Sequence, residues 1–95
     1  MAAYIIAEVE ITDPAAYEDY RKQAPGVIAA FGGRYLARGG AAELLEGQGE
    51  PKRLVILEFP SAAQLRSFYH SPDYQKLVAM RQRAATSRLV AVEGL

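Results

Sequence analysis

Residues 53–59 read Arg-Leu-Val-Ile-Leu-Glu-Phe, which is the strongest strand signal in this chain of 95 residues. Apolar side chains occupy both faces of the alternating pattern, and only one face ends in an acidic residue, Glu58. Nearly continuous apolarity is typical of a central strand that is covered on both sides. We therefore place this stretch in the middle of a sheet.

Three further elements are predicted before this strand. Residues 4–11 form a strand with Ile5, Ala7 and Val9 on one face, because apolar residues recur there at period two. A helix follows over 14–31, with Asp13 as its N-cap and an apolar stripe at three- and four-residue steps. Pro25 predicts a kink or a division into two shorter helices. Residues 34–38 form the next strand, with Arg34, Leu36 and Arg38 on one face.

After the central strand, Ser61 with Gln64 three residues later predicts a capping box at the start of another helix. Ser71 and Pro72 end this helix and begin a second segment, which continues to about Ala85. Residues 89–92 then form the last strand.

The order strand, helix, strand, strand, split helix, strand predicts one domain over residues 1–95 with an α+β, ferredoxin-like (split βαβ, βαββαβ) fold. We expect a four-stranded antiparallel sheet with the helices on one face and the first and third strands at its centre. The helix-free face then carries several apolar side chains, and a second copy is the simplest cover for them, so we expect a homodimer. These side chains are Tyr4, Ile6, Leu36, Leu54, Ile56 and Leu89.

Composition excludes several classes of function. Eleven Lys+Arg balance eleven Asp+Glu, so the chain lacks the basic surplus of a nucleic-acid or anionic-membrane binder. With no Cys and one His, neither a disulfide framework nor a metal site is expected, and no cofactor is predicted. The N-terminus has no basic region or apolar signal core, which indicates a cytoplasmic protein.

Several segments appear together in one order along the chain: 32–40, 45–47, 53–61, 68–74, Arg81 and 92–94. With this set of segments, the chain from about Tyr4 to Leu95 resembles the domain of unknown function 1330 family, within the dimeric α/β-barrel superfamily. The one departure is Phe68, where the family pattern has Trp. The resemblance implies a homodimer whose two sheets form a barrel with helices outside, and it implies no particular reaction.

A group of polar-tipped side chains is predicted to point from the helices toward the sheet: Tyr17, Tyr20, Tyr69, Tyr74 and Arg81. Buried tyrosine hydroxyls and a buried guanidinium need hydrogen-bond partners. A small ligand with a carboxylate or carbonyl group would supply them. The alternative is a network satisfied within the protein, with Arg81 bound to an acidic side chain or to backbone carbonyls.

Two other groups are candidates for chemistry. His70 can act as a general acid or base, or it is a surface residue at a helix C-terminus. Glu8 and Glu58 end the open faces of the central strands, and we expect these strands to be parallel neighbours with both carboxylates at one end. They form a paired-carboxylate site, or they pair with arginines such as Arg34 and Arg38.

Two functions remain open. The first is a small homodimeric, cofactor-free enzyme or binder of a carboxylated or aromatic metabolite. Arg81 would anchor an anion, Tyr20 and Tyr74 would hydrogen-bond it, and His70 would move a proton. The second is a non-catalytic dimeric binding or stress-associated module whose pocket its own side chains fill. A pocket with no room for anything larger than water would contradict the first.

Overall fold

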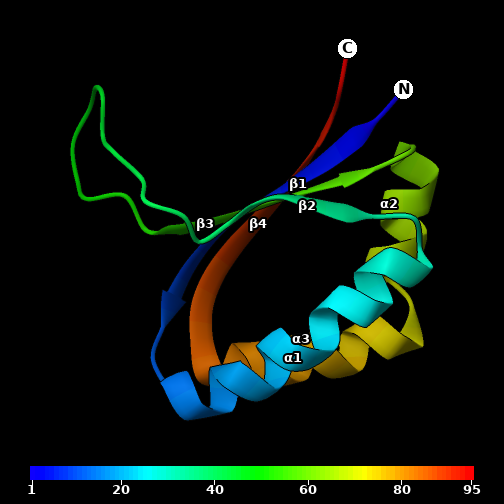
Figure 1. Ribbon diagram of the computed structural model, residues 1–95, viewed down its shortest axis with the longest axis horizontal. Helices are drawn as coiled ribbons and strands as arrows, with labels where there is room; N and C mark the ends of the chain where they lie inside the picture. The colour runs from blue at the N-terminus through cyan, green and yellow to red at the C-terminus, as the bar shows by residue number, and fades with distance from the viewer.

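Seven elements follow one another in a computed structural model that describes residues 1–95. They are β1 (Ala3–Ile11), α1 (Pro14–Ala30), β2 (Arg34–Arg38), β3 (Arg53–Phe59), α2 (Ala62–Tyr69), α3 (Pro72–Ala84) and β4 (Ala85–Glu93). The strands form one sheet in the order β2-β3-β1-β4, and the helices lie together on one side of it (Figure 1). The predicted ferredoxin-like α+β arrangement with β1 and β3 at the centre is confirmed.

All neighbouring strands run antiparallel. The expectation of parallel central strands, used to bring Glu8 and Glu58 together, was therefore wrong. After α1, strand β2 runs in the same direction as β1, and the connection between β2 and β3 then reverses the chain. β3 therefore runs antiparallel to β1, with which it pairs. As a result Glu8 lies opposite Leu54 and Glu58 lies opposite Tyr4, toward opposite ends of the pair.

Side-chain caps fix the starts of the helices. The Asp13 carboxylate accepts a hydrogen bond from the Ala16 amide at 3.2 Å, and the Ser61 hydroxyl accepts one from the Gln64 amide at 3.1 Å. The predicted capping box is only half formed, because the Gln64 side chain donates to the Phe31 carbonyl at 3.2 Å instead. That bond joins the start of α2 to the end of α1.

α1 is one helix with Pro25 inside it, so the predicted alternative of two shorter helices is wrong. One element boundary also differs from the prediction. β4 begins at Ala85 directly after α3, four residues earlier than predicted, because residues 85–88 continue the pairing with β1 as far as Ile11. The strand propensity of residues 85–88 did not reveal this extension, because their pairing with β1 stabilises it.

The core lies between the helices and the face of the sheet that carries Ile5, Leu57 and Phe59. Leu89 also packs against this core and pairs with Ala7, so its predicted place on the open face was wrong. The apolar β4 side chains of the open face are Val90 and Val92, which are 42% and 46% exposed. Ile6 and Leu36, 39% and 49% exposed, extend this apolar surface across the sheet.

An irregularity in β2 corrects the prediction for Arg38. The register shifts between Tyr35 and Ala37, so Arg38 pairs with Val55, which faces the helices. A β-bulge adds one residue and turns the following side chains to the other face. Arg34 remains on the open face, whereas Arg38 reaches the helix side.

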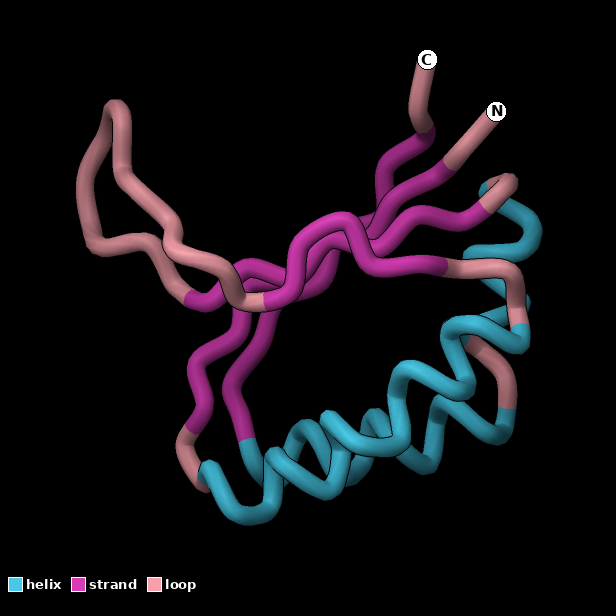
Figure 2. The backbone as a smooth tube through the Cα atoms, in the orientation of Figure 1, coloured by secondary structure: helices cyan, strands magenta, loops and turns pink.

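The connection between β2 and β3, residues 39–52, projects from the body of the protein as a long loop (Figure 2). We call it the arm. It leaves the sheet at the end away from α2 and rises on the side opposite the helices (Figure 1). Residues 40–52 are all exposed.

Candidate functional site

A cavity lies between the sheet and helices α1 and α3, partly open to solvent. Its volume is about 30 Å³, which is room for about two water molecules. Apolar side chains from β1, β3 and β4 form much of its wall. The polar side chains around it are Tyr17, Tyr20, Arg21, Tyr35, Arg38, Arg53, Tyr74 and Arg81.

Arg81 is the most deeply buried cation of this cavity, because the inward stripe of α3 places it there. It is 4% exposed. Its Nη1 donates to the Tyr74 hydroxyl at 2.8 Å, and its buried Nε has no partner. No acidic side chain forms an ion pair with it, so the alternative in which Arg81 binds an acidic side chain of its own chain is not realised. Arg81 is a buried charge with unused donors.

Tyr74 connects Arg81 to a second hydroxyl. The Tyr74 and Tyr20 hydroxyl oxygens are 2.8 Å apart. The hydroxyl of Ser71 accepts from the Tyr74 amide at 3.1 Å and donates to the Phe68 carbonyl at 2.7 Å, which fixes the turn from which Tyr74 projects. Arg81 can only donate, so the Tyr74 oxygen accepts from it and the Tyr74 hydroxyl is free to donate a hydrogen bond to the Tyr20 oxygen. The Tyr20 hydroxyl then remains available to donate a hydrogen bond to a ligand.

Burial disfavours the ionised form of three tyrosines of this cavity. It raises the pKa of the Tyr74 phenol far above its usual value, and it also raises the pKa values of Tyr17 and Tyr35. For Arg81, burial disfavours the cation, but the oxygens of Tyr74 and Tyr20 outweigh this effect and the pKa is raised. The site therefore presents neutral phenol donors and a permanent positive charge.

Arg53 extends the positive charge along the cavity from the start of β3. Its Nε is buried without a partner, and its guanidinium carbon lies 5.9 Å from the centre of the Tyr17 ring. A Cβ at Gly39, where φ is +71°, would collide with this guanidinium. Glycine at this position thus allows both the turn at the foot of the arm and the close approach of Arg53.

Arg38 joins β2 to α1 at the cavity. Pro25 has no amide hydrogen, so the Arg21 carbonyl four residues earlier loses its helical partner. The Arg38 Nη2 donates to this carbonyl at 3.0 Å. The same guanidinium lies 4.6 Å from the centre of the Tyr35 ring. This contact explains how α1 remains one helix through Pro25.

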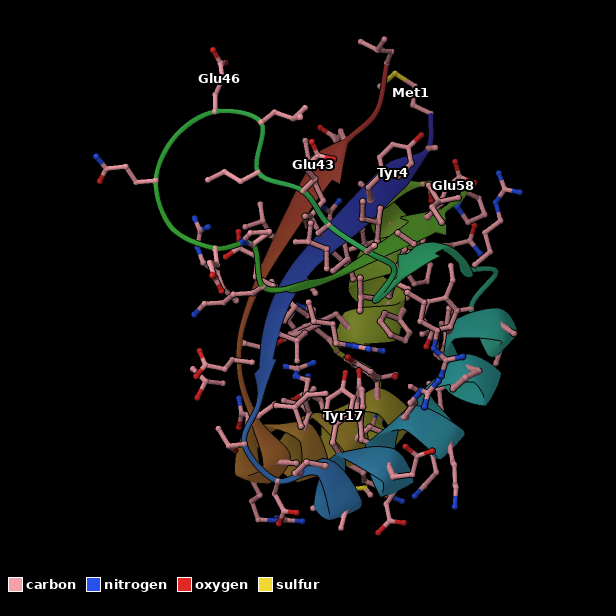
Figure 3. All side chains as sticks on the ribbon, turned by 60° about the vertical axis from the view of Figure 1, so that its left-hand side comes forward. Met1, Tyr4, Tyr17, Glu43, Glu46 and Glu58 are labelled. Atoms are coloured by element: carbon pink, nitrogen blue, oxygen red, sulfur yellow. The ribbon has the colours of Figure 1, made fainter.

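Four arginines and no carboxylate line the cavity. Of the four, Arg21 pairs with Glu18 at 3.5 Å on the exposed side of α1. The electrostatic potential inside is therefore positive, and its apolar walls strengthen the field. Figure 3 shows Tyr17 directed from α1 toward the sheet, where it forms part of this surface.

The structure brings together five of the predicted site residues: Tyr17, Tyr20, Tyr74, Arg81 and Arg38. The other four do not line this cavity. They fall into two groups, which lie elsewhere on the molecule.

His70 caps the C-terminus of α2, is exposed, and lies with Tyr69 in a separate groove. Glu8 and Glu58 lie on the open face of the sheet. Glu58 forms an ion pair with Arg34 at 2.6 Å, as the structural alternative predicted.

Three cavity residues were missed as ligand contacts: Arg21, Tyr35 and Arg53. Arg53 could have been found, because it precedes Val55 by two residues and so shares its face at period two. Tyr35 could have been found in the same way, because period-two alternation places it on the face of β2 opposite to that of Arg34. Arg21 carries no such signal, since it lies outside the apolar stripe of α1.

The side chains and helices form neither a cluster of metal-ligating groups nor a membrane-spanning helix. No three His, Cys, Asp or Glu side chains gather where they could hold an ion. None of the helices combines the length and apolarity that a membrane span requires.

The chain is a small α+β domain with a ferredoxin-like sheet, an apolar open face and a cationic cavity between the sheet and the helices. Residues 2–95 match the family described as "Domain of unknown function (DUF1330)", and the chain belongs to this family. The resemblance seen in the sequence is thereby confirmed. No curated protein matches the chain.

Solved structures share the fold. A protein of unknown function, RPA0582 from Rhodopseudomonas palustris, has a TM-score of 0.79 and 24% identity over 99% of this chain and 82% of its own. A dimeric ferredoxin-like protein of unknown function from Jannaschia sp. CCS1 has a TM-score of 0.72 and 17% identity, covering 99% and 100%. SnoaB, a cofactor-independent oxygenase from Streptomyces nogalater, has a TM-score of 0.69 and 12% identity, covering 99% and 93%. At these identities the likeness concerns the fold alone.

Proposed function

We propose that this protein is a homodimer whose helix–sheet cavity binds a small carboxylate or a similar oxoanion. The observation that carries the proposal is Arg81, which is 4% exposed, has no acidic partner and has an unpartnered Nε. A buried charge without a counter-charge costs several kcal/mol. An anion would remove this cost, and a carboxylate matches the fork of guanidinium donors.

The surrounding side chains support the same ligand class. Arg53 adds a second cation with an unused donor, and Tyr20 can donate its hydroxyl proton to a ligand oxygen. The lining contains no carboxylate to repel an anion. If the protein is an enzyme, Tyr20 is the proton donor best placed to act without a cofactor, because it is the last member of the hydrogen-bond series from Arg81 through Tyr74 to Tyr20.

The homodimer is supported by the exposed apolar face and by relatives that are described as dimeric. A patch that includes Ile6, Leu36, Val90 and Val92 is unusual for a monomer. Stacking the open faces of two copies would cover these side chains.

One observation favours the second candidate, a non-catalytic module. At about 30 Å³ the cavity admits water but no metabolite, which is the result that counts against the metabolite hypothesis. A ligand of the size of acetate or larger must therefore displace side chains at the mouth. Arg21 and Arg38 are exposed there, and their long side chains can move.

Melting in the presence of anions tests the proposal. Wild type, Arg81→Met and the exposed control Arg83→Met are compared in chloride, formate, acetate and benzoate at one ionic strength. At a hundred times the dissociation constant, a bound anion stabilises wild type by about 2.7 kcal/mol. We expect Arg83→Met to respond like wild type. We expect Arg81→Met to be as stable as wild type without ligand, or more stable, and not to respond to the anions.

Two results would contradict the proposal. If no carboxylate exceeds chloride for wild type, the cavity is filled by the protein's own side chains. If Arg81→Met still responds, the anion binds elsewhere. A response to formate and acetate but not to benzoate would keep the anion site and exclude aromatic ligands.

A further inference from the structure

The arm carries apolar side chains that nothing in its own chain covers. Leu45 is 84% exposed and Leu44 is 46% exposed. Unstructured connections of this length are uncommon in small domains unless they have a function. The arm also carries Glu43, Glu46 and Glu50, none of which forms an ion pair, whereas its one cation, Lys52, binds Glu10 at 3.2 Å.

The apolar residues and the acidic residues of the arm thus point to a partner that offers an apolar surface with positive charge beside it. Figure 3 shows Glu46 projecting from the top of the arm, away from the body of the protein.

A groove with these properties lies between α2 and the edge strand β4. Its volume is about 310 Å³. Arg66 and His70 lie at this groove, both are exposed, and neither forms an ion pair. The remaining lining is mostly apolar: Ile5, Leu65, Tyr69, Leu89, Val90 and Ala91.

The arm cannot reach the groove of its own chain. It joins the end of β2 to the start of β3, whereas α2 follows the end of β3, so the two features lie at opposite ends of that strand. The arm also rises on the side of the sheet away from the helices (Figures 1 and 2). If two open faces stack about a two-fold axis that runs obliquely across the strands, both the strand ends and the sheet edges are exchanged, and the arm of each copy lies above the α2 end of β4 in the other.

We infer that in the homodimer each arm docks into the α2–β4 groove of the other copy. Leu45 enters the apolar groove, and Glu43 and Glu46 lie beside the Arg66 cation and the His70 side chain. The inference rests on the homodimer proposed above, and it adds which segments make the contact. It also assigns a function to the groove that contains His70 and Tyr69, two residues that do not line the anion cavity.

Disulfide trapping tests the contact without background, because the chain has no cysteine. The variants Leu45→Cys and Arg66→Cys are purified separately, mixed, allowed to exchange subunits and oxidised mildly. We expect a covalent dimer that contains one chain of each variant. A mixture of Gln82→Cys with Leu45→Cys is the control, because Gln82 lies on the exposed side of α3, and it should give no such product.

Dissociation constants of the dimer provide a second measurement. Leu45→Ala should weaken the dimer roughly 100- to 3,000-fold, because it removes about three buried carbon groups from each of the two symmetric arm contacts, whereas Gln48→Ala on the same arm should change little. Glu46→Arg and Arg66→Glu should each weaken the dimer by about two- to fivefold. The double variant should recover much of this loss.

The outcomes separate the two proposals. A monomeric wild type contradicts both the homodimer and the arm contact. A dimer that forms no 45–66 disulfide and is insensitive to Leu45→Ala contradicts the arm contact alone. A dimer that forms the disulfide and weakens with Leu45→Ala supports both.

Discussion

The cavity under the helices and the open face of the sheet are incomplete in opposite ways. In the cavity, the cation Arg81 is buried without a counter-charge. On the open face, apolar side chains such as Ile6 and Val92 are exposed to solvent. Each arrangement costs free energy in an isolated chain. Under the proposals made above, an anion would complete the first region and a second copy of the chain would complete the second.

The largest expected effect concerns the open face. Ile56 lies opposite Ile6 on this face, and Ile56→Asp would place an unpaired charge in the proposed interface at a cost of several kcal/mol. We expect a monomer by light scattering and a lower melting temperature. Ala79→Asp on the exposed surface of α3 is the control. An Ile56→Asp variant with the mass and stability of wild type would show that this face is not an interface.

The second prediction concerns the buried phenols. The pKa of Tyr74 is raised in the folded protein, so the unfolded chain loses its phenol proton first. The stability from this group is complete below about pH 10 and falls as the pH rises above it, by up to about 1.4 kcal/mol per pH unit. Tyr17 and Tyr35 act in the same direction.

Urea unfolding between pH 8 and pH 11, values chosen to bracket a normal phenol pKa of about 10, measures this loss. Tyr74→Phe should reduce the slope above pH 10. It should also cost about 1–3 kcal/mol at neutral pH, because Arg81 Nη1 loses its acceptor. An unchanged alkaline slope in Tyr74→Phe would mean that Tyr74 does not contribute to it.

The smallest effect concerns the contact between Arg38 and α1. Arg38→Met should cost about 1 kcal/mol in wild type, because the Arg21 carbonyl loses its donor. In a Pro25→Ala background the new amide can serve that carbonyl, and the same substitution should cost almost nothing. A double-mutant cycle measures the coupling. Strict additivity would disprove the link between Pro25 and Arg38.

The local signals in the sequence were sufficient to predict most elements. Asp13, Ser61 and Ser71 marked the helix starts, since each cap acts within three residues along the chain. Period-two alternation placed Leu57 and Phe59 in the core. The inward stripe of α3 predicted the burial of Arg81, although not the absence of an acidic partner.

Features that depend on contacts between distant segments required the tertiary structure. The bulge in β2 turned Arg38 toward the helices, and the pairing with β1 extended β4 and turned Leu89 inward. The antiparallel register separated Glu8 from Glu58. The tyrosine hydroxyls met because α1 and α3 pack side by side, 54 residues apart in sequence at Tyr20 and Tyr74.

The sequence by itself determined the order of the elements, their caps and the apolar character of both sheet faces, because these depend on residues close together in the chain. Only the tertiary structure decided which polar side chains share a cavity and which remain without a partner. That outcome depends on strand register and helix packing, where a shift of one residue moves a side chain to the other face of the sheet.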